Sequence, residues 1–107
     1  MSSIAATLLC PTPRERLVDG HGRPYFLWDV ELSLEEFERR LADAAPEARA
    51  YWTGKLMRQA KPDDVLTFLS SRELLERWQG VERYLGRSRP FWAWLLGTWH
   101  GMDLGAE

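Results

Sequence analysis

Residues 46–60 read PEARAYWTGKLMRQA, and their spacing predicts the central helix of a small helical domain. Proline suits the first turn of a helix, so Pro46 marks the predicted start. At about 3.6 residues per turn, small residues line one seam of this helix and larger apolar residues line another. A helix with two apolar seams needs neighbours on both sides. The small-residue seam consists of Ala50, Gly54 and Met57, and the other consists of Ala48, Trp52, Leu56 and Ala60.

Capping signals on both sides of this segment predict further short helices. Ser33 with Glu36, and Ser70 with Glu73, match the capping box, in which the two side chains satisfy free backbone N–H groups at a helix start. The first box opens a helix that runs to about residue 44, and further helices are predicted at 63–69, 71–78, 81–85 and 90–99. The fold class is therefore mainly α, a small bundle of about five short helices, in which residues 45–69 resemble one HEAT-type helical hairpin.

The region before residue 33 predicts a β-hairpin or extended arm. A turn signal, DGHG at 19–22, separates residues 16–18 from 23–28. From residue 25 the pattern has period two, which places Phe26 and Trp28 on one side and Tyr25 and Leu27 on the other. An isolated hairpin is barely stable in water, so this arm must pack on the helices or add to a sheet elsewhere. We expect a disordered N-terminal tail at 1–13, a single helical domain at 14–100 and a loose C-terminal tail at 101–107.

Composition limits the class of protein. The chain has 107 residues, enough for one domain, and a net charge of −2, which argues against a dedicated nucleic-acid binder. Cys10 is the only cysteine, so no intrachain disulfide forms and the cytoplasm is the expected compartment. No run approaches about 20 apolar residues, and the short apolar stretch 4–10 lacks the basic residues of a signal peptide. We therefore expect no membrane association.

The charges are unevenly distributed along the chain. Residues 29–47 carry seven acidic side chains against two arginines, and residues 48–90 carry nine basic side chains against five acidic ones. This layout fits docking in a fixed orientation on a charged partner, although ordinary solvated helix faces also explain it. The predicted acidic contacts are Glu35, Glu38 and Asp43. Within the basic region, Arg49 lies beside an apolar seam, where Asp29, Asp63 or Asp64 would serve as its ion-pair partner.

Residues 90–99 read PFWAWLLGTW and carry no charge. Helical spacing puts Trp92, Leu95, Leu96 and Trp99 on one stripe and Phe91, Trp94 and Thr98 on the opposite one. A helix that is apolar all round is buried either in a core or against a second molecule. Tryptophan clusters favour interfaces, and an extended segment at 25–28 could add a strand to a partner's sheet. The candidate apolar interface residues are Trp92, Trp94, Trp99, Phe91, Tyr25 and Leu27.

Catalytic chemistry has no clear signal in the sequence. His21, His100 and Cys10 lie in separate regions without metal-ligand spacing, so we expect no metal, no cofactor and no enzymatic activity. One alternative is a small nucleic-acid-associated regulator, in which arginines beside aromatic residues hold phosphates and stack bases. Its candidate residues are Arg83, Arg87 and Arg89. A third possibility is a homodimer that buries Phe91 and Trp94 across its two-fold axis.

Three segments carry a resemblance to a known group of proteins: GRPYFLWD at 22–29, RAYWTGKLMRQA at 49–60 and GRSRPFW at 86–92. Over about residues 14–100 the chain resembles small bacterial proteins encoded beside nucleotidyltransferase toxins of the abortive-infection (AbiE-like, type IV toxin–antitoxin) kind. The resemblance implies a cytoplasmic antitoxin-like or accessory protein whose partner is the toxin. It implies no residue roles. The N-terminal winged helix-turn-helix of the better-known AbiE antitoxin has no counterpart in the pattern here.

Overall fold

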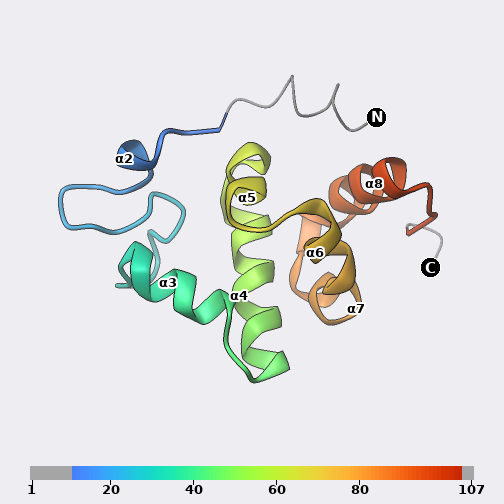
Figure 1. Cartoon of the computed structure of the whole chain (residues 1–107), viewed down its shortest axis with the longest axis horizontal. Coiled ribbons are helices and arrows are strands. Elements are labelled where there is room, and N and C mark those ends of the chain that lie inside the picture. The colour runs from blue at the N-terminus through green and yellow to red at the C-terminus, as the bar shows by residue number, and fades with distance from the viewer. Residues whose placement is uncertain (1–10, 105–107) are drawn as a thin grey trace.

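Helices account for most of the described part of the chain, residues 11–104, in the computed structural model (Figure 1). The predicted small helical bundle is therefore confirmed. Residues 1–10, which make up most of the predicted N-terminal tail, and residues 105–107 lie outside the described residues. The elements are α2 (Arg14–Leu17), α3 (Leu34–Leu41), α4 (Pro46–Gln59), α5 (Pro62–Phe68), α6 (Ser71–Glu76), α7 (Trp78–Val81), the 3₁₀ turns η1 (Glu82–Tyr84) and η2 (Gly86–Ser88), and α8 (Arg89–His100).

The predicted central helix, α4, lies between α3 on one side and the α6–α8 region on the other (Figure 1). Both of its seams contribute buried residues, among them Ala50, Gly54, Leu56 and Met57. A Cβ atom at Gly54 would lie 2.6 Å from the Cβ of Tyr84, so only glycine allows η1 to approach this closely. The small-residue seam of α4 therefore sets the distance to the C-terminal half of the molecule.

Aromatic rings from three separate segments build one side of the core. Phe26, Phe37 and Phe68 meet edge to face, with ring centroids 5.2–5.8 Å apart. On the other side of α4, the buried indole of Trp92 donates a hydrogen bond from Nε1 to the backbone oxygen of Met57, at 2.9 Å. This bond satisfies the one polar group of the indole and fastens α8 to α4.

The helix ends follow the predicted capping chemistry with one difference. Ser70 and Glu73 form the complete capping box at the start of α6. Ser33 accepts the backbone N–H of Glu36 at 3.1 Å, but the Glu36 carboxylate turns to Arg39 and Arg40 instead of the helix start. That carboxylate has two guanidinium partners within reach on its own helix, and these replace the reciprocal half of the box.

The arm before α3 is not a hairpin of two strands. Within the described residues, its only β pairing is a single antiparallel bridge between Val18 and Pro24, after which the chain passes through turns. The predicted alternation therefore fails: Phe26 and Leu27 are adjacent and both fully buried, while Trp28 is 67% exposed. Turns rotate successive side chains by angles other than the half-turn of a strand, so neighbours in sequence share one side.

The arm is attached to α4 through polar contacts. Lys55 is only 3% exposed, and its ammonium group lies 2.7 Å from the carboxylate of Asp29. Gln59 donates from Nε2 to the backbone oxygen of Phe26 at 2.6 Å. The hydrogen bond from Lys55 holds the pKa of Asp29 below its usual value. These contacts stand in place of the sheet that a hairpin would have required.

Candidate protein-interaction surface

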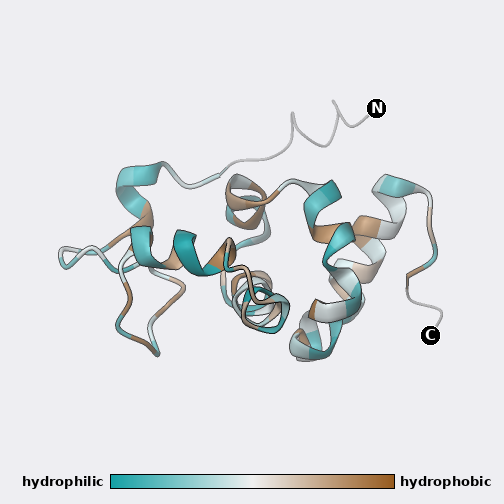
Figure 2. Cartoon of the chain, turned by 60° about the horizontal axis from the view of Figure 1, so that its bottom comes forward, coloured by the Kyte–Doolittle hydropathy of each residue, from teal (hydrophilic) through white to brown (hydrophobic). Residues whose placement is uncertain are grey.

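Helix α8 has one buried and one exposed face. Trp92 and Leu96 are at most 1% exposed, whereas Phe91 is 40% and Trp94 62% exposed. The rings of Phe91 and Trp94 lie side by side, with centroids 6.2 Å apart. Figure 2 shows the contrast with α3, which is largely hydrophilic, while most of α8 is neutral to hydrophobic. We call the exposed residues Pro90, Phe91, Trp94 and Thr98 the outer face of α8.

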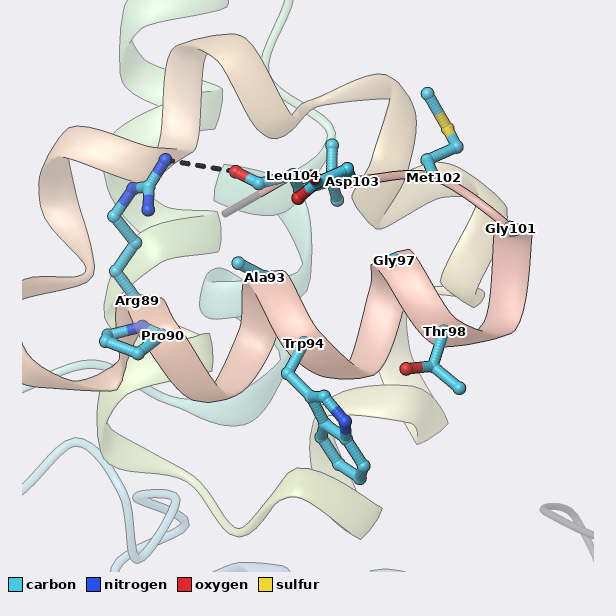
Figure 3. A pocket seen from close by; sticks show the side chains of 10 residues that line it. All are labelled: Arg89, Pro90, Ala93, Trp94, Gly97, Thr98, Gly101, Met102, Asp103 and Leu104. Atoms are coloured by element: carbon cyan, nitrogen blue, oxygen red, sulfur yellow. Dashed lines mark hydrogen bonds between the residues drawn. The ribbon is translucent and has the colours of Figure 1, made fainter. Parts of the chain in front are cut away.

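The chain after α8, residues 101–104, turns back and packs on the side of the helix away from Trp94. Gly101 adopts a φ of 66°, a conformation that favours glycine, and ends the helix. A Cβ at Gly97 would lie 2.6 Å from the backbone oxygen of Met102, so the returning segment passes directly over the helix. Arg89 donates to the backbone oxygen of Leu104 at 3.3 Å (Figure 3). Figure 3 also shows that Trp94 points away from this segment.

An open groove of about 640 Å³ runs along α8 beside its outer face. Its walls are mostly uncharged, with Trp94 and Thr98 on one side of the helix and the returning segment on the other (Figure 3). Because α8 is held at both ends and along its inner face, the exposed rings sit on a rigid support. Rigid aromatic side chains lose little conformational freedom on binding, which suits them as anchors for a second molecule.

The structure places several predicted interface residues in the core. Trp92 and Leu27 are 1% and 0% exposed, so neither is accessible to a partner; both fill the space around α4. Trp99 is half-buried and packs against the core. Tyr25 is partly exposed, but its hydroxyl group donates to Asp64 and accepts from the Lys61 backbone N–H. The segment 25–28 lies in turns, so it presents no strand edge to a partner's sheet.

The three predicted acidic contacts have different environments. Glu38 forms an ion pair with Arg14, with an N–O distance of 3.2 Å. Asp43 accepts the backbone N–H of Ala45 at 2.8 Å and so shapes the loop before α4. Glu35 is exposed on α3. Since α3 and α8 lie on opposite sides of α4 (Figure 1), the structure does not bring the acidic and aromatic candidates together on one surface.

The predicted arginine patch is also divided. Arg89 pairs with Glu82 at 2.7 Å and its guanidinium lies over the ring of Trp78, so it serves the internal structure. Arg83 lies over the ring of Tyr84, and Arg87 is exposed on η2. Two of the three candidates thus remain at the surface, one of them against an aromatic ring.

Two polar features of the fold escaped the sequence reasoning. The buried carboxylate of Asp64 accepts hydrogen bonds from Tyr25 and Thr12. An acidic residue at the start of a helix is expected instead to cap the helix and to face solvent. Arg49 does not pair with any of the predicted aspartates; it donates to the backbone oxygen of Asp43 at 2.8 Å. No local pattern signals either contact, because the partners are distant in sequence or are backbone atoms.

Among the residues that the structure describes, no cluster of three His, Cys, Asp or Glu side chains is arranged to hold a metal ion. No helix in this part of the chain has the length and apolar character needed to cross a membrane. Comparison of the chain with models of protein families, with curated proteins and with solved structures found no match.

Proposed function

We propose that the chain is a non-enzymatic protein-interaction module whose outer face of α8 anchors a protein partner. The exposure of Trp94 beside Phe91, on a helix with no charge between residues 90 and 99, carries this proposal. Tryptophan and other large aromatic residues dominate binding energy at interfaces, because they remove much apolar surface from water at little entropic cost. The module acts by binding, and neither a metal nor a cofactor takes part.

The partner we propose is a nucleotidyltransferase toxin, which the module binds in the cytoplasm as an antitoxin-like or accessory protein. The support for this identity is the resemblance in residues 22–29, 49–60 and 86–92. A stable interface covers about 800 Å² on each partner, more than two rings supply. Pro90, Thr98 and the exposed Met102 around the rings supply a further part of this area. Glu35, on the far side of α4, makes at most a peripheral contact.

The test is the mass in solution of the chain alone and co-expressed with the toxin, measured by light scattering. A stable complex of the two proteins is the expected result. Trp94→Ser should weaken it by about 2 kcal/mol or more, roughly thirtyfold in Kd. Trp28→Ser is the matched control, since Trp28 is equally exposed, at 67%, but lies in the arm on the other side of α4. That variant should bind like the native chain.

Two results would contradict the proposal. The first is a chain that stays monomeric and forms no complex with the toxin at micromolar concentration. A doubled mass of the chain alone, lost in Trp94→Asp, instead assigns the outer face of α8 to a homodimer. The nucleic-acid alternative predicts salt-dependent binding of RNA or DNA that is lost with Arg83 and Arg87.

A further inference from the structure

Two arginines share a cleft that contains no residue of the outer face of α8. The cleft measures about 190 Å³ and lies between the first half of α4 and the α6–α7 region. Helices α4 and α7 are in contact in the fold. Small residues line it alongside the arginines. The lining residues are Pro46, Arg49, Ala50, Glu76, Arg77 and Gly80.

Both guanidinium groups are held by neutral oxygen atoms. Arg49 donates from Nη1 to the backbone oxygen of Asp43 at 2.8 Å. Arg77 donates from Nη1 to the backbone oxygen of Leu41 and to Oγ1 of Thr53, both at 2.9 Å. None of the ion pairs among the described residues includes either arginine. The two side chains are therefore fixed in place while their charges are not neutralised by direct contact.

Most donors of this pair remain available. A guanidinium carries five N–H donors, and only three hydrogen bonds from the two groups are made within residues 11–104. No buried side-chain nitrogen or oxygen in that range lacks a hydrogen-bond partner, so the remaining guanidinium nitrogens are open to solvent. Both arginines are half-buried, which limits how far the side chains can move. The two arginines thus contribute several N–H donors at this cleft, whose lining also includes the carboxylate of Glu76.

The surroundings of the cleft disfavour the positive charge of Arg77. Burial lowers the pKa of Arg77, and the nearby charge of Arg49 lowers it further. Glu73 and Glu76 act in the opposite direction without cancelling these effects. Glu47 also lies in the first turn of α4, which begins here without a side-chain cap. The uncapped helix start adds a small positive potential, so an anion bound in the cleft would relieve the repulsion.

We propose that this cleft binds a small oxyanion, the phosphate group of a small molecule, with Arg49 and Arg77 as its ligands. Planar guanidinium groups match pairs of phosphate oxygens and bind them through charge-assisted hydrogen bonds. The cleft equals about six waters at about 30 Å³ each, enough for one phosphate group.

The test is a titration of the full chain with sodium phosphate, followed by NMR chemical shifts of the cleft residues, with sodium chloride at matched ionic strength. We expect chemical-shift changes that saturate with phosphate but not with chloride, with a Kd for phosphate in the millimolar range. Arg49→Gln should weaken binding at least about tenfold, a loss typical of one charge-assisted contact. Arg72→Gln is the control, because this exposed arginine on α6 does not line the cleft. Arg77 is left intact, because it also supports Leu41 and Thr53.

A second pair of variants leaves both arginines in place. A Cβ at Gly80 would lie 3.5 Å from the Cβ of Ala50, an ordinary contact, so Gly80→Ala should fold and bind like the native chain. Gly80→Asp puts a carboxylate in the cleft, where it competes with the anion. Phosphate binding should fall at least about tenfold in this variant, while its thermal stability is retained.

A small phosphate monoester, glycerol 3-phosphate, distinguishes the source of the phosphate. Tighter binding than inorganic phosphate identifies an organic phosphate as the ligand, and equal binding identifies free phosphate. Equal shifts with phosphate and chloride would overturn the proposal. So would native affinity in both Arg49→Gln and Gly80→Asp.

Discussion

The hydroxyl group of Tyr25 donates a hydrogen bond to Oδ2 of Asp64 at 2.6 Å, joining the N-terminal arm to the start of α5. Thr12 contributes two more bonds to the same carboxylate, from its backbone N–H at 2.6 Å and its hydroxyl group at 2.8 Å. Asp64 is fully buried, and its three donors come from positions 52 and 39 residues away. This carboxylate therefore fixes the path of the arm over the helices.

Tyr25→Phe should destabilise the protein by about 1.5–3 kcal/mol, the contribution of a hydrogen bond to a charged group. The change removes only the hydroxyl group, so the ring contact with Phe26 is retained. Chemical denaturation measures the free energy of unfolding. Tyr51→Phe is the matched control: no hydrogen bond is made by the Tyr51 hydroxyl group in the described structure, and a change within about 0.5 kcal/mol is expected. Equal effects of the two substitutions would contradict this role.

The same contact predicts the pH dependence of stability at both extremes. Burial alone would raise the pKa of Asp64, but hydrogen bonds from Tyr25 and Thr12 outweigh it and lower the pKa. Its stabilisation is present above the unfolded pKa of about 3.9 and is lost as the pH falls through the lower folded value. Acid unfolding monitored by circular dichroism should therefore begin at higher pH in Asp64→Asn than in the native chain, if other carboxylates are protonated equally in both.

At alkaline pH the relevant group is Tyr25, whose pKa is raised to about 12 by burial and by the hydrogen bond to Asp64. The raised pKa means that the folded protein stabilises the protonated hydroxyl group. The contribution of this group to the free energy of unfolding is therefore complete below about pH 10 and is lost as the pH rises toward 12. An ultraviolet absorbance titration should show one of the three tyrosines ionising near pH 12. That late step should be missing in Tyr25→Phe, and its persistence there would assign it to another tyrosine.

Two glycine substitutions should have opposite outcomes. Gly54→Ala forces a Cβ to within 2.6 Å of the Cβ of Tyr84, and we expect a loss of about 1–3 kcal/mol from overpacking. Gly80→Ala meets only an ordinary contact on a helix and should be neutral or stabilise by up to about 1 kcal/mol. Thermal denaturation of the two variants under identical conditions checks the contrast.

The two neighbouring tryptophans of α8 should also differ in their effect on stability. Trp92→Ala removes a buried indole and its bond to Met57, at a cost of about 3–5 kcal/mol. Trp94→Ala changes a side chain that is mostly in water and should alter the free energy of unfolding by at most about 0.5 kcal/mol. Native stability in Trp92→Ala would show that α8 does not pack on α4 as described.

Local patterns predicted the helices well, because their signals lie within a few residues of one another. The capping box of Ser70 and Glu73 is an example, because both of its hydrogen bonds are made within three residues of chain. The arm was predicted poorly. Its period-two pattern at 25–32 satisfied the sequence criterion for a strand, but residues 11–104 contain no partner strand, and turns there bury Phe26 and Leu27 together.

The candidate site shows the same division. The uncharged segment 90–99 and its two opposite stripes follow from residue order and helical geometry. Which stripe faces the core does not, because both are apolar and either could pack against α4. In the fold Trp92 lies inside, where its indole donates to the backbone oxygen of Met57, and Phe91 and Trp94 lie outside.

The sequence by itself determined the elements of this protein: short capped helices, a central helix with a small-residue seam, and an uncharged aromatic helix at the end. Each of these rests on interactions over a few residues of chain. Only the tertiary structure decided the environment of Asp64, Lys55, Arg49 and Arg77, since their partners are backbone atoms or lie far away in sequence. The burial of these side chains and the compensation of their charges depend on which surfaces of the molecule pack together on folding.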